Sequence, residues 1–476
     1  MAFGGNNISP PLLTSTRAKI NFFTGAAVLS PDSFKMKFRE TEGNISDASG
    51  NLLMSSNGIW IADASGDTMQ NGSNLNPGIF TNMYKNIGLT IPNGNVFIPY
   101  PGDTSKYILF HMTGNLDTVP STELYYSVID MNLHNGLGAV TLKNQIAIKE
   151  NLSWGIGACK HANGRDWWIL AVKDSSNLVY RVLVTPQGLT NVSSQIFANL
   201  ISYRWSSHQL TFSPNGSKFA FATTNYYSNP YQTNVRLFDF DRCTGLLSNQ
   251  RNIAIPDTNP GAGTAFAPSS KYLYYATFKV LYQINTDSSN VQASLDSIAG
   301  YDNFVSGGNP YLFWLLYLAN DGKIYIPGNI NTTSSYINYP DSGGIACDMQ
   351  QHALIFPCYV IGAVPNHPNY FLGPLENSGC DTLSGIKNKF TSLQQNLKIA
   401  PNPSSNGSFG ITYVLAQNQK GLLQIFDVNG KKVYEYNLPP WSTYQQIEVP
   451  QLSNGIYALR LQSGKSVRQA KLLIQK

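Results

Sequence analysis

The sequence predicts an all-β chain in which a seven-bladed β-propeller is followed by a small, immunoglobulin-like β-sandwich. The first observation is a turn-and-strand pattern that recurs about every 50 residues along most of the chain, which is typical of propellers. The second is the C-terminal stretch, where turn signals separate short alternating apolar runs, as in a small sandwich. The predicted boundaries are 1–382 for the propeller, 383–396 for a linker and 397–476 for the sandwich.

The repeat is clearest in three segments, Phe212–Ala222, Phe266–Ala276 and Leu318–Ile326. Each combines a strand end, a tight turn of small polar residues and an alternating aromatic or aliphatic strand. Looser copies with the same layout are Ile45–Leu53, Pro101–Leu109 and His161–Ile169. The turn centres, spaced 52 to 59 residues apart, are Gly50, Ser105, Gly164, Gly216, Ser270 and Gly322. Glycine supplies the positive φ that a two-residue hairpin requires.

The number of blades follows from how the ring closes. Six turns are visible, and a seventh unit is predicted where Asn369–Leu372 meets N-terminal strands around Lys19–Phe23. Joining both ends of the propeller segment in one blade would lock the ring and remove exposed sheet edges. We therefore predict seven blades, with six as the alternative. An open solenoid is less favoured, since no polar capping repeat is evident.

Composition excludes several classes of partner. Charged residues make up 12% of the chain and the net charge is +5, with no cluster of basic residues. A nucleic-acid footprint would be clustered, so none is predicted. No apolar stretch approaches the roughly 20 residues of a membrane helix, so no transmembrane segment is predicted. The first residues also lack the basic and apolar regions of a signal peptide.

Four motifs follow one another in the C-terminal stretch. The residues that carry them are Pro401, Asn402, Pro403, Asp427, Gly430, Lys431, Gly455, Tyr457 and Lys471. Their order and spacing resemble the C-terminal sorting domain of type IX (Por) secretion in Bacteroidetes, over Leu397–Lys476. The resemblance implies contact with the type IX secretion machinery, export across the outer membrane, and surface anchoring or release. It also implies removal of the tail after export.

The ring segment resembles a family of secreted, WD40-like Bacteroidetes propellers. The phrases that carry this resemblance are Ile45–Leu53, Met69–Gly72, His161–Trp168, Phe240–Ser248 and Pro368–Pro374. The resemblance implies a secreted or outer-surface location and brings no assigned reaction. The entry segment, Ser9–Arg17, departs from the family pattern. The resemblance therefore does not assign the outer strand of the first blade.

Motifs for catalysis or metal binding are missing from the sequence. The six histidines have no metal-ligand spacing, the five cysteines contain no C-x-x-C pair, and there is no G-x-S-x-G elbow. Cysteine pairing stays open. No catalytic residue, metal site or cofactor is therefore predicted. Calcium is the alternative, because the sequence contains oxygen-bearing pairs. Asp47 with Asn51 and Asp63 with Asp67 lie in turns, and Asp239 with Asp241 lies on one face of an extended run.

Two clusters are candidate ligand-binding sites. The first combines polar and aromatic residues in one turn: His161, Asn163, Arg165, Asp166 and Trp167. The second is a tyrosine-rich loop that contains Tyr226, Tyr227 and Tyr231, whose flat amphipathic rings suit carbohydrate or protein. For the first cluster the alternative is a tight turn, with Arg165 paired to Asp166 and Trp168 in the core between blades.

The favoured function is an exported, non-catalytic binding or scaffold module for a protein or glycan, delivered by its sorting domain. One alternative is a propeller enzyme that acts on extracellular polysaccharide. It would require His, Asp or Glu side chains that converge in the central channel. The other alternative is a structural subunit of a surface assembly.

Overall fold

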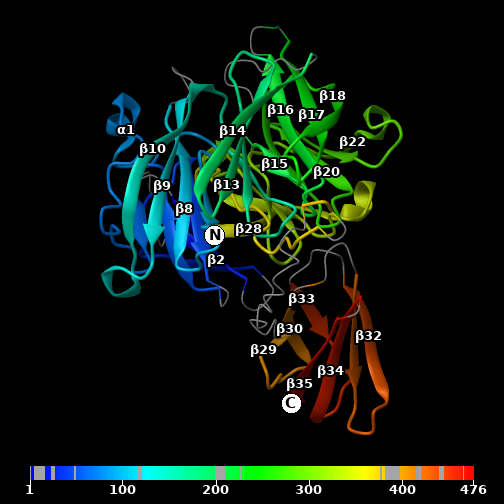
Figure 1. The fold of residues 1–476 in the computed structure, drawn as a ribbon. Coiled ribbons are helices and arrows are strands. Elements are labelled where there is room, and N and C mark those ends of the chain that lie inside the picture. Colours follow the sequence, from blue (N-terminus) through cyan, green and yellow to red (C-terminus); the bar gives the residue numbers. More distant parts are fainter. Residues whose placement is uncertain are drawn as a thin grey trace.

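The computed structural model describes residues 2–4, 17–22, 27–47, 50–114, 121–198, 209–225, 228, 230–375, 378–380, 397–413, 415, 420–438, 444–464 and 466–476. In these residues almost every regular element is a β-strand. The exceptions are helix α1 (Ile79–Tyr84) and short 3₁₀ turns at His134–Gly136, Gln292–Ser294 and Gly344–Cys347. Figure 1 shows the strands of the tail, in orange to red, as a body of their own. The all-β prediction is confirmed.

Six antiparallel sheets, numbered 1 to 6 below, succeed one another in the described part of the ring segment. Sheet 1 contains β4 (Gly43–Ser46), β5 (Leu52–Ser56) and β6 (Ile61–Asp63). Sheet 2 contains β7 (Asn95–Pro99), β8 (Lys106–Met112), β9 (Ser121–Asp130) and β10 (Ala139–Leu152). Sheet 3 contains β11 (Gly157–Lys160), β12 (Trp167–Val172), β13 (Leu178–Thr185) and β14 (Gly188–Ile196).

The other three sheets have the same layout, in which each strand pairs with the next one in sequence. Sheet 4 contains β15 (Thr211–Phe212), β16 (Lys218–Asn225), β17 (Gln232–Phe240) and β18 (Leu247–Ile255). Sheet 5 contains β19 (Gly261–Phe266), β20 (Tyr272–Thr277), β21 (Val280–Asn285) and β22 (Asp296–Gly300). Sheet 6 contains β25 (Tyr317–Leu318), β26 (Ile324–Pro327), β27 (Asn331–Ile337) and β28 (Met349–Val360), preceded by the small hairpin β23 (Val305–Ser306) and β24 (Asn309–Pro310).

The predicted repeat corresponds to the turn between the first and second strand of each sheet. Five of the predicted turn centres have positive φ: Gly50, Gly164, Gly216, Ser270 and Gly322. In most of these turns an aspartate or asparagine accepts a backbone N–H, as Asn215 Oδ1 does from Ser217 N at 2.9 Å. Glycine adopts positive φ without steric cost, which explains its recurrence at these positions.

The first strands of the sheets surround a common axis. Strand β4 lies beside β7, β11 beside β15, β15 beside β19, and β19 beside β25. Ile156 N donates to Asn93 O at 3.2 Å, which connects the entries of sheets 2 and 3. Apolar clusters fill the spaces between adjacent sheets, such as the one that joins sheets 2 and 3 around Phe110 and Trp154. This arrangement is a β-propeller.

Gln209, two residues before β15, connects three sheets through one buried side chain. Its Oε1 accepts hydrogen bonds from Thr264 N at 3.0 Å and Leu316 N at 2.9 Å, and its Nε2 donates to Leu316 O at 2.9 Å. Thr264 belongs to sheet 5 and Leu316 directly precedes sheet 6. A buried amide N–H without an acceptor is costly, so Gln209 fixes the spacing of the inner strands.

After β28 the chain crosses the axis as a segment that we call the strap, residues 361–375. Its contacts reach residues in or next to the first strands of three sheets, through Asn366 to Ile156, Asn369 to Pro214 and Tyr370 to Phe97. His367 lies between Tyr317 of sheet 6 and Asn44 of sheet 1. The strap therefore closes the gap between the first and last sheets with side-chain hydrogen bonds.

The predicted pairing of Asn369–Leu372 with the N-terminal strands is wrong in the described residues. The N-terminal sheet contains β1 (Ala2–Gly4), β2 (Arg17–Asn21) and β3 (Val28–Pro31), which pair only with one another, and it packs beside β28. The physical reason lies in the strap itself. Pro365 and Pro368 have no N–H for a sheet ladder, and the asparagines between and after them bond outward through their side chains.

The tail is a sandwich of two sheets, as predicted. One contains β29 (Lys398–Ala400), β30 (Ser408–Thr412) and β33 (Tyr444–Glu448). The other contains β31 (Gly421–Phe426), β32 (Lys432–Leu438), β34 (Gly455–Ser463) and β35 (Ser466–Ile474), in the order β32-β31-β34-β35. Phe409 and Ile411 of the first sheet meet Leu423, Leu459 and Leu472 of the second in one apolar core.

Replacing Gln209 by leucine should lower the free energy of unfolding of the ring by about 3 kcal/mol. Two buried backbone N–H groups would lose their acceptor, and each costs about 1–3 kcal/mol. Urea unfolding followed by tryptophan fluorescence measures the change. Gln187→Leu is the matched control because Gln187 is exposed in the β13–β14 turn. Equal stability of the two variants would contradict the role given to Gln209.

Candidate functional site

The first predicted site, around His161, is the turn that joins β11 and β12. His161 Nε2 donates to Cys243 O at 2.9 Å, and its Nδ1 accepts from Asn163 N at 3.1 Å. Arg165 Nε donates to Asp166 Oδ1 at 2.7 Å, and Asn163 Nδ2 donates to Asp166 Oδ2 at 2.8 Å. The structure therefore brings the four polar residues together, with their hydrogen bonds directed toward one another and toward the neighbouring turn.

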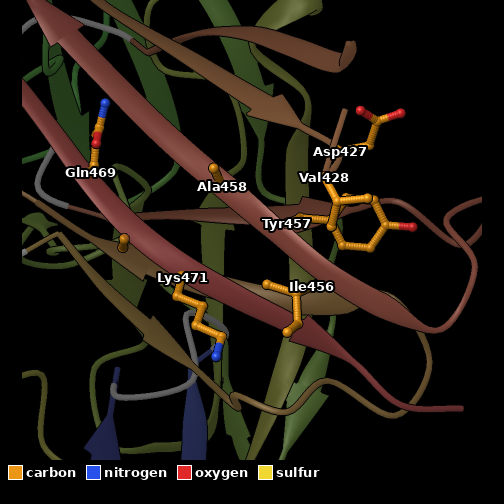
Figure 2. Close-up of a pocket in the computed structure, with 8 residues that line it drawn as sticks. Asp427, Val428, Ile456, Tyr457, Ala458, Gln469 and Lys471 are labelled. Atoms are coloured by element: carbon orange, nitrogen blue, oxygen red, sulfur yellow. The ribbon is translucent and has the colours of Figure 1, made fainter. Parts of the chain in front are cut away.

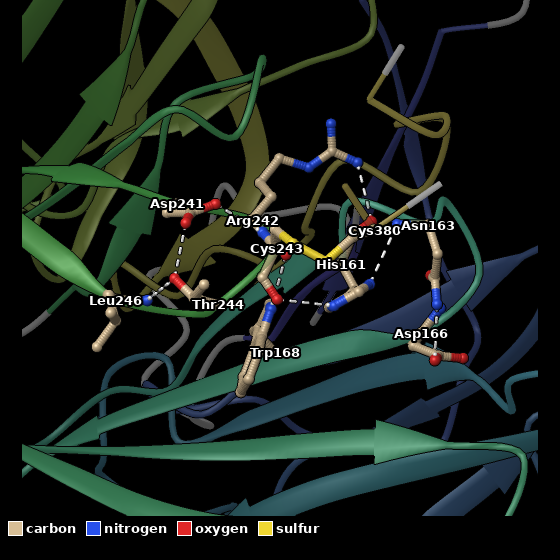
Figure 3. Close-up of a disulfide and its surroundings, with 10 residues drawn as sticks. All are labelled: His161, Asn163, Asp166, Trp168, Asp241, Arg242, Cys243, Thr244, Leu246 and Cys380. Atoms are coloured by element: carbon tan, nitrogen blue, oxygen red, sulfur yellow. Dashed lines mark hydrogen bonds between the residues drawn. A yellow bond between two sulfur atoms is a disulfide. The ribbon is translucent and has the colours of Figure 1, made fainter. Parts of the chain in front are cut away.

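The turn around His161 is bound to the β17–β18 turn of sheet 4. Trp168 Nε1 donates to Arg242 O at 2.9 Å, and Arg242 Nε donates back to Lys160 O at 2.9 Å. Figure 3 shows His161 directly beside the disulfide between Cys243 and Cys380. These hydrogen bonds connect the turn of sheet 3 to the turn of sheet 4 and stabilise the contact between the two sheets.

The aromatic member of the site, Trp167, is 1% exposed and packs between sheets 2 and 3. Its ring lies 5.5 Å from the ammonium nitrogen of Lys160, a cation–π distance. Burial, followed by the positive charge of Arg242, lowers the pKa of Lys160 to about 8. Lys160 is a charged group near the axis that the sequence did not single out, since nothing in its spacing distinguishes it from a surface lysine.

The tyrosine-rich loop is placed only in part. Tyr226 and Tyr227 lie outside the described residues, whereas Tyr231, at the β16–β17 connection, is 39% exposed. Connections between second and third strands lie on one face of the ring. Those between first and second, and between third and fourth, lie on the opposite face because the strands are antiparallel.

Two of the oxygen-bearing pairs lie in turns that their own carboxylates hold, whereas Asp239 lies in strand β17. Asp47 Oδ1 accepts from Asn51 N at 2.9 Å, and Asp63 Oδ1 accepts from Ser65 N at 2.8 Å. Asp239 pairs with Arg251. Across the parts of the chain that the structure describes, no group of three or more His, Cys, Asp or Glu side chains has the arrangement of a metal site.

The cysteines form one disulfide, between Cys243 and Cys380, and the pairing that the sequence left open is thereby given. Cys159, Cys347 and Cys358 are buried thiols. Burial raises the pKa of Cys159 and of Cys358 to about 12, so both are protonated at neutral pH. Neither has the character of a nucleophile.

A buried polar network lies where the ring closes, and its residues were not predicted from the sequence. His367 Nδ1 accepts from Tyr317 Oη at 2.8 Å, and Nε2 donates to Asn44 O at 2.9 Å. Asn44 Nδ2 donates to Glu42 Oε1 at 3.2 Å. Burial lowers the pKa of His367 to about 4, so the ring is neutral at pH 7 with both nitrogens engaged. The network is built to hold sheets 1 and 6 together.

In the tail, two of the sorting motifs make hydrogen bonds that hold the domain together. Asn402, between Pro401 and Pro403, donates from Nδ2 to Lys471 O and accepts at Oδ1 from Leu473 N, both at 2.8 Å. Its side chain thus pairs with the outer edge of β35 as a strand would. Asp427 Oδ1 accepts from Lys431 N at 2.9 Å across the β31–β32 turn, where Gly430 has a φ of 74°.

An open groove of about 480 Å³ lies on the tail where these motifs meet. Its lining residues are Asp427, Val428, Ile456, Tyr457, Ala458, Gln469, Ala470 and Lys471. Figure 2 shows Asp427 and Tyr457 on one side and Lys471 and Gln469 along the neighbouring strand. Val428 is 79% exposed and Ile456 46% exposed, so the groove carries apolar surface beside one acid and one lysine.

The comparisons with known proteins assign the tail. Residues 398–475 match the family described as "Secretion system C-terminal sorting domain". The prediction of a type IX (Por) sorting domain is confirmed, and the match supports export to the outer cell surface. Among curated proteins, none matches the chain. In the described residues, no helix has both the length and the apolar character to cross a membrane.

Solved structures similar to the chain are distant. A protein from Lactobacillus plantarum is 10% identical with a TM-score of 0.37, covering 86% of this chain and 100% of its own. The extracellular domain of a putative hybrid two-component system from B. thetaiotaomicron is 10% identical with a TM-score of 0.35, covering 91% and 49%. A putative oxidoreductase (glucose dehydrogenase) from Thermus thermophilus is 9% identical with a TM-score of 0.39, covering 65% and 94%.

The closure by His367 should make the ring lose stability on acidification. The pKa is about 4 in the folded state against 6.5 for a free histidine, so the unfolded chain binds the proton first. The contribution is complete above pH 6.5 and is lost as the pH falls toward 4, by about 2 kcal/mol between pH 7 and pH 5. Urea unfolding at both pH values measures it.

His367→Gln is the matched variant because glutamine can both donate and accept a hydrogen bond but does not titrate. It should show a smaller loss between pH 7 and pH 5 than the wild type. His111 is buried with a lowered pKa in both proteins, so its effect cancels. The same pH dependence in both proteins would show that His367 does not control it.

Proposed function

We propose that the chain is an exported protein whose ring is a non-catalytic binding module for a protein or a glycan. The single observation that carries the proposal is the sorting domain at residues 398–475, which gives the ring an extracellular destination. The ring, as cargo, then meets ligands outside the cell or at its surface.

The state of the axis supports binding rather than catalysis. The strap is bonded to three sheets across the axis, and both nitrogens of His367 are engaged. Ligand contact is therefore assigned to the loops. The face that carries the first–second and third–fourth turns holds the strap exit at Leu375, bonded to Ala162. The opposite face, which carries the β16–β17 connection with Tyr231, is the proposed binding face.

The binding face is tested by glycan-array binding of the full chain and of Tyr231→Ala. A tyrosine ring that stacks on a sugar contributes on the order of 1 kcal/mol, so binding should fall about fivefold or more. Tyr339→Ala is the matched control, because Tyr339 is 58% exposed in the β27–β28 turn on the other face. Equal loss in both variants would refute the assignment of the face, and no binding of the wild type to any glycan would refute a glycan as the ligand.

The groove of the tail is the proposed contact with the type IX secretion machinery. Its exposed apolar residues, Val428 and Ile456, are available to a partner without disturbing the core. Deleting Leu397–Lys476 in a type IX-competent host should leave the protein in the periplasm. Cell fractionation and immunoblotting measure the distribution.

Serine at Val428 and Ile456 should reduce export severalfold while the tail stays folded. Val467→Ser is the matched control, since Val467 is 46% exposed on β35 but does not line the groove. If the groove variants were exported like the wild type while the deletion was not, another surface of the tail would make the contact. Export of the deleted form would overturn the sorting role itself.

A further inference from the structure

The strap is held across the axis at separate points. Asn366 Nδ2 donates to Ile156 O at 2.7 Å, Asn369 Nδ2 to Pro214 O at 2.8 Å, and Tyr370 Oη to Phe97 O at 2.8 Å. Each bond goes to a different sheet and comes from a side chain. In the described residues the strap joins no strand ladder, so its hold on the ring lacks the cooperativity of a sheet.

The C-terminal end of the strap lies between two turns. Leu375 N donates to Ala162 O at 2.7 Å in the β11–β12 turn, and Gly373 O accepts from Arg242 Nη2 at 2.6 Å in the β17–β18 turn. The same Nη2 donates to His161 O at 3.1 Å. Arg242 thus binds the strap and the neighbouring turn at once.

The disulfide lies at this exit, next to Arg242 in sequence. Cys243 belongs to the β17–β18 turn and Cys380 follows the strap, with a sequence separation of 137. Figure 3 shows the bond beside His161, between the turn and the end of the strap. It closes a covalent loop that contains sheets 5 and 6 and the strap itself. While the disulfide is intact, the strap cannot leave the axis unless the β17–β18 turn moves with it.

We propose that the Cys243–Cys380 disulfide is an oxidation-dependent latch that fixes the strap across the axis of the ring. In the reduced chain the strap is held by its separate hydrogen bonds and opens locally. Oxidation joins the two sulfurs and completes the closed ring. Given the proposed export, this step takes place outside the reducing cytoplasm.

The chemistry of the latch balances with a disulfide oxidant, such as oxidised glutathione or a disulfide-bonded oxidoreductase. The two S–H bonds break, one S–S bond forms, and two electrons and two protons pass to the oxidant, which becomes two thiols. The other cysteines do not compete. Cys159, Cys347 and Cys358 are buried, and burial raises the pKa of each thiol.

Hydrogen–deuterium exchange of the full chain tests the latch. The proteins are the oxidised wild type, the wild type treated when folded with a phosphine reductant, and the variant Cys243→Ser/Cys380→Ser. Peptides over residues 361–375 should lose protection at least tenfold in the reduced and variant proteins. Peptides over Lys106–Met112 of β8, which lies away from the latch, should change less than twofold.

Cys358→Ser is the control, since it removes a thiol that forms no disulfide. Unchanged protection of the strap after reduction would overturn the proposal. An equal loss of protection over the whole ring would also overturn it, because the disulfide would then stabilise the entire ring rather than fix the strap. Reduction of the folded wild type gives the answer even if the double variant does not fold. Failure here leaves the export assignment untouched, because export is read by fractionation of cells.

Discussion

The sheets of the ring have two apolar faces, and this constraint governs the rest of the fold. Strand β12 is the clearest case, because all six of its residues are buried. Its odd-numbered residues pack in the cluster shared with sheet 2, and its even-numbered residues pack in the cluster shared with sheet 4. Such a strand is stable only with a sheet on each side, so the sheets continue around an axis until the first and last approach each other.

The meeting of first and last sheet is therefore the critical point of the molecule. Here the chain uses polar groups instead of a shared ladder, with His367 between Tyr317 and Asn44. Individual hydrogen bonds contribute about 1 kcal/mol each. The Cys243–Cys380 disulfide adds a covalent bond where the strap leaves the axis. This bond holds the end of the strap in place even when one of its separate hydrogen bonds opens.

Local rules predicted the repeat, and non-local packing accounts for what they missed. The turns at Gly164 and Gly216 were identified because positive φ and small polar residues are local requirements. The strap was misassigned because its partners, such as Phe97 for Tyr370, lie hundreds of residues away. The turn at His161 is predicted both as a ligand site and as a structural turn, because asparagine and aspartate serve tight turns and ligands equally well. Only the structure shows where their hydrogen bonds go.

The tail separates residues that hold the domain together from residues that remain available to a partner. Asn402 uses its side chain on the edge of β35, and the Asp427 carboxylate holds a turn. Val428 and Ile456 are instead exposed in the groove. A variant of a residue that holds the domain together, such as Asn402, can block export by unfolding the tail. A variant of an exposed groove residue, such as Val428, blocks export only by disturbing recognition. Because Asn402 and Asp427 stabilise the domain itself, the presence of their motifs in a sequence identifies the domain without locating its contact surface.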